Sequence, residues 1–198
     1  MRRPIVFLAS FACTVLTLRA ALDLTPTLKE YTSEGIAFKR LVFNDGKKQI
    51  TYDLPSRWNY RAIGDSIKLI PPNALNADVF IGALPLTTAQ PFDDKGIATA
   101  REHFMQGIPA TVQSMKVVAE QLNTVPFKAG NYEITVSYQA LGEIFIRRAL
   151  YINLADTQLV FRLSARKTEF EGLWRTFRSS ILSWQGVEPD SAATVVQK

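Results

Sequence analysis

Histidine and cysteine are almost absent from this chain. Its 198 residues include one histidine, His103, and one cysteine, Cys13. A single thiol cannot form an intramolecular disulfide, and one cysteine with one histidine cannot build a structural zinc site. The sequence also contains no G-x-S-x-G, Gly-rich phosphate-loop or H-E-x-x-H pattern. We therefore expect no enzymatic activity, no catalytic residue and no cofactor, and we interpret His103 as a solvent-facing helix residue.

Acidic residues are present, but their spacing does not suit a metal ion. Hard cations such as calcium need six or more oxygen ligands, usually from a compact loop of the D-x-[DN]-x-[DN]-G type. No such loop occurs in the sequence. We expect no metal site, because turns and helix starts account for the acids that stand out, which are Asp45, Asp93, Asp94, Glu143 and Asp156.

The apolar run from Ile5 to Leu18 is too short for a transmembrane helix, which needs roughly 20 residues. It follows a basic leader, and this arrangement is typical of a signal peptide. We expect residues 1–21 to be cleaved and the protein to be periplasmic or secreted. The residues before Cys13 resemble a lipoprotein box only faintly, so membrane association is expected only if the leader is retained or Cys13 is lipidated.

The excess of positive charge is concentrated in this leader. The whole chain has a formal charge of +5; loss of residues 1–21 removes three arginines and no acid, leaving 20 Lys and Arg against 18 Asp and Glu, or +2. Proteins that bind nucleic acid usually present a strongly basic face. We therefore expect no nucleic-acid partner.

Length and composition indicate one domain. A chain of 198 residues with 47% hydrophobic residues can build one substantial core but not two. We expect a linker or arm over residues 22–34, a single α+β domain over 35–184, and a disordered tail over 185–198, whose polar, small residues provide little surface to bury.

In the first half of this domain, turn-forming residues separate short apolar segments that are typical of strands, and a helical pattern follows them. Asn44-Asp45-Gly46 supplies residues that tolerate positive φ, as a tight hairpin turn requires. Asp93 and Asp94 precede apolar residues at helical spacing, and negative charge favours a helix start. The expected elements are strands over 35–43, 47–55, 66–70 and 77–84, a helix over 92–106 and a short helical piece over 109–115.

The second half indicates antiparallel strands and a closing helix. Residues 132–140 alternate apolar and polar side chains, which predicts one buried and one solvent-facing side. Thr168 and Glu171 fit a capping box, and the apolar stripe from Phe170 to Trp184 needs a sheet to pack on. The expected strands cover 115–122, 132–140, 143–154 and 158–166, paired antiparallel because short turns join them.

These elements predict an α+β fold: an antiparallel β-sheet meander with an N-terminal hairpin, packed by a middle helix and a C-terminal helix in an α/β/α sandwich. The element order, with Leu54-Pro55-Ser56-Arg57-Trp58 after the hairpin and Phe177-Arg178-Ser179-Ser180-Ile181 near the end, resembles the PsbP-like superfamily. That group includes the photosystem II extrinsic protein and exported bacterial proteins of the DcrB and LpqN type. The resemblance covers residues 35–184 and implies a fold, not an activity.

Trp58 stands three residues after the proline that ends the expected hairpin. Such a ring serves either as a contact for an apolar or sugar-like ligand or as a plug over the open end of the core. We favour the plug, because Pro55 fixes φ where the chain turns and the family resemblance supports this role.

Four residues of the last two strands form the most notable cluster. If the chain turns near Asp156, Arg147 lies opposite Arg166 and Tyr151 opposite Arg162, so three cations and an aromatic ring share one sheet face. Like charges side by side destabilise a sheet unless something neutralises them. The neutralising group is either an anionic or protein partner or the neighbouring acids Glu133 and Glu143, and we favour the acids.

Three functions remain open. The leading hypothesis is an exported, non-enzymatic binding or accessory protein that acts on an envelope protein partner through its sheet and loops. The alternative is a carrier that holds a small apolar ligand between sheet and helices. A hydrolase with an unrecognised site is the third, and no motif supports it.

Overall fold

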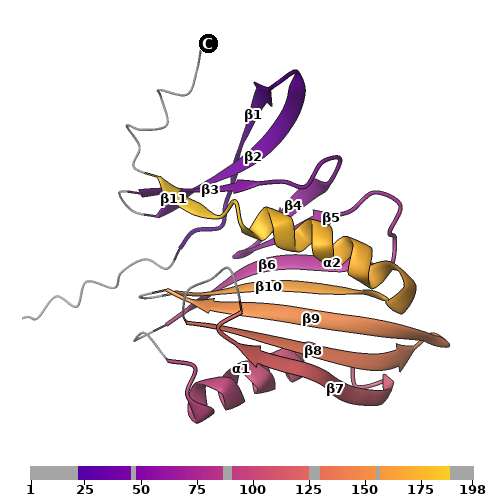
Figure 1. Cartoon of the computed structure of the whole chain (residues 1–198). Coiled ribbons are helices and arrows are strands. Elements are labelled where there is room, and N and C mark those ends of the chain that lie inside the picture. Colours follow the sequence, from indigo (N-terminus) through magenta and orange to yellow (C-terminus); the bar gives the residue numbers. More distant parts are fainter. Residues whose placement is uncertain (1–21, 46–47, 87–90, 125–129, 155–156, 188–198) are drawn as a thin grey trace, which may run out of the picture.

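The computed structural model describes residues 22–45, 48–86, 91–124, 130–154 and 157–187. Within these ranges the chain is a mixed α+β protein, made mostly of strands, with two helices and two antiparallel sheets (Figure 1). Neither helix in this part of the chain is long and apolar enough to cross a membrane.

The larger sheet contains seven strands within the described residues, all paired antiparallel. The last four strands of this sheet are neighbours in the sequence and in space. In spatial order the strands are β4 (Asn59–Ile63), β5 (Ser66–Ile70), β6 (Asp78–Pro85), β10 (Thr157–Arg166), β9 (Glu143–Asn153), β8 (Asn131–Ala140) and β7 (Gln113–Leu122).

The smaller sheet contains both the first and the last strand of the described chain, at its opposite edges. Its order is β1 (Thr27–Ser33), β2 (Ile36–Asp45), β3 (Lys48–Asp53) and β11 (Gln185–Val187). The expected hairpin is confirmed as the pairing of β2 with β3; its turn residues 46–47 lie outside the described residues.

Helix α1 (Asp94–Gln106) begins as the sequence predicts. The Asp93 side chain accepts a hydrogen bond from the Gly96 amide at 2.8 Å, and Asp94 adds negative charge to the first turn, where the helix dipole favours it. The helix ends at Gly107.

Helix α2 (Lys167–Ile181) starts differently from the prediction. The chain passes from β10 directly into the helix, so Arg166 occupies the N-cap position without a side-chain cap. Thr168 is already inside the first turn, and the expected capping box is therefore wrong. The apolar stripe is confirmed as a packing face, because Phe170, Trp174, Phe177 and Ile181 are buried.

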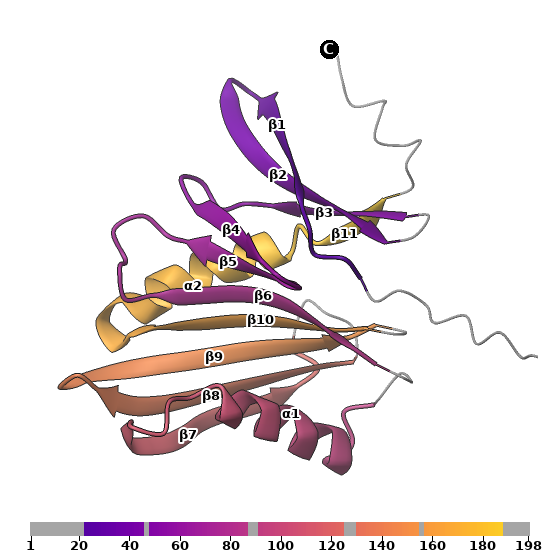
Figure 2. The same cartoon turned by 180° about the vertical axis from the view of Figure 1, so that it is seen from behind.

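The two helices cover opposite faces of the larger sheet. α2 lies in front of it in Figure 1, and α1 lies in front in the reverse view of Figure 2. Alternate residues of β9 and β10 serve the two sides: Leu150 and Phe161 pack in the core under α2, whereas Tyr151 and Val160 pack in the core under α1. The two hydrophobic cores therefore pack against opposite faces of the same strands.

Several local predictions are wrong, and three of the errors share a cause. Residues 22–34 were expected to be a linker, yet Thr27–Ser33 pairs with β2. Gln185–Val187 of the expected tail pairs with β3, and residues 188–198 lie outside the described residues. The strand Asn59–Ile63 was not predicted. All three strands are mostly polar or exposed, so backbone pairing rather than an apolar pattern defines them.

The helical piece expected over 109–115 does not form, because β7 begins at Gln113.

Candidate functional site

Trp58 packs inside the protein. A tight turn in which its amide bonds the Pro55 carbonyl at 3.0 Å places it there, and Arg57 adopts positive φ in this turn. The Trp58 side chain is 4% exposed and stacks on Phe177 of α2 with centroids 6.4 Å apart. This geometry agrees with a plug that closes the core beneath α2.

The four-residue cluster shares one face, but its pairing differs from the prediction by two residues. Arg147 lies opposite Ser164, and Tyr151 lies opposite Val160. Gln158 pairs with Asn153, so every partner lies two residues away from its predicted position. A shift of two preserves the face, because side chains alternate with a period of two.

Helix α1 covers part of this face, beside Tyr151, whereas Arg162 and Arg166 are only half-buried. Arg147 and Tyr151 are buried. Arg162 donates to Asp78 at 3.0 Å and lies over the Phe80 ring at 4.7 Å.

Acids neutralise part of the cluster, as the favoured interpretation expects. Arg166 forms an ion pair with Glu143 at 2.5 Å. Glu133, by contrast, projects to the other face of the sheet and lies near Arg148.

His103 is exposed, as expected, but it has one specific partner. Its Nδ1 lies 3.1 Å from the Tyr151 hydroxyl. Partial burial, and secondarily the charge of Arg162, lowers the pKa of His103. The imidazole is therefore neutral at pH 7 and can accept this hydrogen bond.

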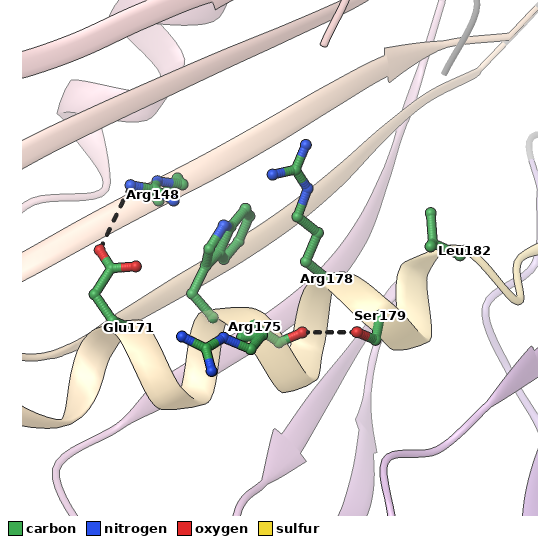
Figure 3. Close-up of a pocket in the computed structure, with 7 residues that line it drawn as sticks. Arg148, Glu171, Arg175, Arg178, Ser179 and Leu182 are labelled. Carbon is green, nitrogen blue, oxygen red and sulfur yellow. Dashed lines mark hydrogen bonds and ion pairs between the residues drawn. The ribbon is translucent and has the colours of Figure 1, made fainter. Parts of the chain in front are cut away.

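A groove on the opposite face is the best candidate site. We call it the α2 groove; it lies between α2 and β9, and its volume is about 460 Å³. Figure 3 shows Arg148 and Glu171 pointing toward one another and Arg178 extending from α2 toward the strands. Its lining residues are Arg148, Glu171, Trp174, Arg175, Arg178, Ser179 and Leu182.

Arg148 is held rigidly at one wall of the groove. Its guanidinium lies 5.2 Å from the Phe170 ring centroid and 5.0 Å from that of Trp174, which gives cation–π contacts on a buried aromatic surface. Its Nε donates to Thr135 Oγ1 at 2.8 Å. Glu171 approaches it at 3.9 Å but is largely exposed, so this ion pair adds little.

Glu133 of β8 lies near Arg148 on this face, and its burial differs from the prediction for β8. The strand was expected to have one wet side, yet Glu133 and Thr135 on that side are buried. Burial raises the pKa of the Glu133 carboxyl, while the charges of Arg148 and Arg178 oppose the rise. The polar side of β8 is therefore buried at Glu133 and Thr135, near Arg148, but Ser137 is half-buried and Gln139 is exposed as expected.

Trp174 supplies a second kind of donor. Its side chain is 3% exposed, and its buried Nε1 has no hydrogen-bond partner among the described residues. An indole N–H can only donate. This N–H is buried, so the surface of the α2 groove is set by three arginines and a single glutamate among its lining residues, an arrangement suited to an anionic acceptor.

Sequence reasoning missed this groove although one signal pointed to it. Alternation along 143–154 places Arg148 on the face opposite Arg147, and residues 171, 175 and 178 follow at helical spacing. The missing step was to combine a strand residue with a helix residue.

The described residues contain no group of three His, Cys, Asp or Glu side chains arranged to hold a metal ion. No protein-family model matches the chain, and no curated protein is significantly similar to it in sequence.

Proposed function

We propose that this protein is an exported, non-enzymatic binding or accessory protein that docks an acidic segment of an envelope protein partner in the α2 groove. A PsbP-like α/β/α sandwich is the scaffold that we propose for it. One observation carries the proposal: three guanidinium groups and a single carboxylate line the α2 groove.

A carboxylate fits these donors chemically. Arginine binds carboxylates through parallel N–H donors, and such charge-assisted hydrogen bonds are stronger than neutral ones. Leu182 at the end of the groove adds an exposed apolar contact for a neighbouring side chain of the partner.

A labelled peptide of alternating Glu and Leu residues tests this function. A peptide in which Gln replaces each Glu is the uncharged control. We expect the Glu peptide to bind in fluorescence anisotropy and to move the indole N–H signal of Trp174 in NMR spectra. Arg175→Glu should weaken binding by about tenfold or more, since it replaces an attraction with a repulsion. Arg61→Glu is the matched control, because Arg61 is exposed on β4, away from the groove.

Equal binding of the Glu and Gln peptides, or an equal loss in the Arg175→Glu and Arg61→Glu variants, would contradict an anion-selective groove. A Trp174 signal that stays in place while other indole signals move would place the peptide elsewhere.

A second candidate, the small-ligand carrier, has one observation in its favour. A cavity of about 210 Å³ lies between α1 and the ends of β6 and β10, with apolar Leu84, Phe92 and Ala100 beside polar His103 and Gln158. It is smaller than the 300–1,000 Å³ of typical ligand sites, so it suits only a small molecule. Native mass spectrometry of the purified protein distinguishes the candidates, since a carrier should retain its ligand.

A further inference from the structure

A cavity of about 210 Å³ lies beside α1, at the ends of β6 and β10, on the face of the larger sheet that Figure 2 shows in front. We call it the α1 cavity. An apolar cavity of about 150 Å³ is large enough to hold a benzene molecule. The α1 cavity therefore has room for a single ring with one small substituent.

Apolar side chains form one wall of the α1 cavity. Leu84 of β6 and Ala100 of α1 line it and pack with the core beneath α1. Phe92 also lines it, and its ring is tilted against that of Tyr132 with centroids 5.9 Å apart. Aromatic rings pair favourably with other rings, edge to face or in offset stacks. This wall therefore suits an aromatic ligand.

The polar side of the cavity supplies one donor and one acceptor. The Tyr151 hydroxyl lies 3.1 Å from His103 Nδ1, and burial keeps the pKa of His103 low, so the ring is neutral at pH 7. Because Nδ1 accepts, the proton of the neutral ring lies on Nε2, which can donate. The Gln158 amide nitrogen donates to Asn153 Oδ1 at 2.7 Å, so the Gln158 side-chain carbonyl oxygen is left to accept a hydrogen bond.

None of the described residues that line the α1 cavity is an aspartate, glutamate, lysine or arginine. A charged ligand would lose its hydration there without gaining an ion pair, which is unfavourable. Arg162, whose charge acts on His103, is not a lining residue and already donates to Asp78 at 3.0 Å. The cavity therefore favours a neutral ligand.

Building on the carrier function, we propose that the α1 cavity binds a neutral, single-ring aromatic molecule with one hydroxyl group, a member of the phenol class. The ring packs on the apolar wall, and the hydroxyl group exchanges hydrogen bonds with His103 and Gln158. The Thr99 hydroxyl does not compete for the ligand, because it donates to the Lys95 carbonyl at 3.0 Å. Thr99 and His103 are exposed, so a ligand can reach the cavity from solution.

Phenol is the probe, titrated into the full protein without a histidine tag at pH 7 and followed by calorimetry and NMR. His103 is the only histidine in the sequence, so its ring signals identify themselves. We expect saturable binding that moves these signals. Toluene, in which a methyl group replaces the hydroxyl, should bind more weakly because it leaves both polar partners unsatisfied. Benzoate should bind more weakly by about tenfold or more, because its charge has no partner in the cavity.

A change in the cavity wall gives an independent test. Ala100→Leu should weaken phenol binding by about tenfold or more, because the longer side chain fills the cavity. Ala98→Leu is the matched control, since Ala98 is an exposed residue of the same helix that does not line the cavity. Far-UV circular dichroism shows whether both variants fold. If Ala100→Leu does not, the comparison of the three probes in the unaltered protein decides the proposal.

The proposal is overturned if phenol does not saturate, if toluene or benzoate binds as tightly as phenol, or if the two folded leucine variants bind phenol equally. The carrier function would survive any of these results if native mass spectrometry still detected a retained ligand, which would then belong to another chemical class. The peptide test of the α2 groove is separate, because the described linings of the two sites share no residue.

Discussion

Arg147 and Arg148 are neighbours in the sequence but have opposite environments. Arg147 lies beneath α1 with unsatisfied N–H groups, whereas Arg148 lies over two aromatic rings at the wall of the α2 groove. The alternation of side chains along a strand places them on different faces. One dipeptide thus places a buried arginine on one face of the sheet and a groove-lining arginine on the other.

Trp58 offers a test of stability at the residue scale. Trp58→Ala should lower the free energy of unfolding by about 3–5 kcal/mol, because it leaves a cavity next to Phe177 in a close-packed core. Denaturant unfolding measures this loss. Leu75→Ala serves as the control, since Leu75 is 99% exposed and should change stability by no more than about 0.5 kcal/mol. A loss below about 1 kcal/mol in Trp58→Ala would show that the ring is not a plug.

At the scale of elements, the sequence predicts those segments whose pattern arises from burial. Ser66–Ile70 matches its strand, and the helix expected over 92–106 is observed over Asp94–Gln106. Apolar periodicity and a capping aspartate are local signals, so they can be read without knowing the fold. The polar strands β1, β4 and β11 have no such signal, because each is defined by the strand beside it.

The candidate sites depend on the same distinction. The sequence predicts that Arg147, Tyr151, Arg162 and Arg166 share a face, since only the period of two is needed. It does not predict which helix covers that face, nor that Arg148 lines the same groove as Arg175 and Arg178. These contacts require the packing of α1 and α2 on the sheet, which no local pattern specifies.

The pairing of β11 with β3 gives a prediction at this scale. A chain that ends at Trp184 should be less stable than one that ends at Val187 by about 1–3 kcal/mol, because the shorter chain loses the backbone pairing of residues 185–187 with Gln49–Thr51. Chemical denaturation of the two truncated proteins measures the difference. Both lack residues 188–198, so the comparison isolates β11. Equal stabilities would mean that this pairing contributes nothing.

At the scale of the whole molecule, two hydrophobic cores lie on opposite faces of one sheet and share its central strands. Leu150 and Tyr151 are consecutive residues of β9, yet they belong to different cores, as do Val160 and Phe161 of β10. Neither core can lose its packing without disturbing strands that support the other. We therefore expect the domain to unfold in one cooperative step.

Tryptophan fluorescence reports on only one of the two cores, and this makes the cooperativity measurable. Trp58, Trp174 and Trp184 all pack in or against the core beneath α2, whereas Phe104 of α1 is buried in the core on the opposite face. Phe104→Ala should destabilise the protein by about 3–5 kcal/mol. If the shared sheet couples the cores, tryptophan fluorescence and far-UV circular dichroism should shift to the same lower denaturant midpoint, with an unchanged slope. If α1 instead unfolds by itself, the circular dichroism transition will split while the fluorescence midpoint stays at its wild-type value.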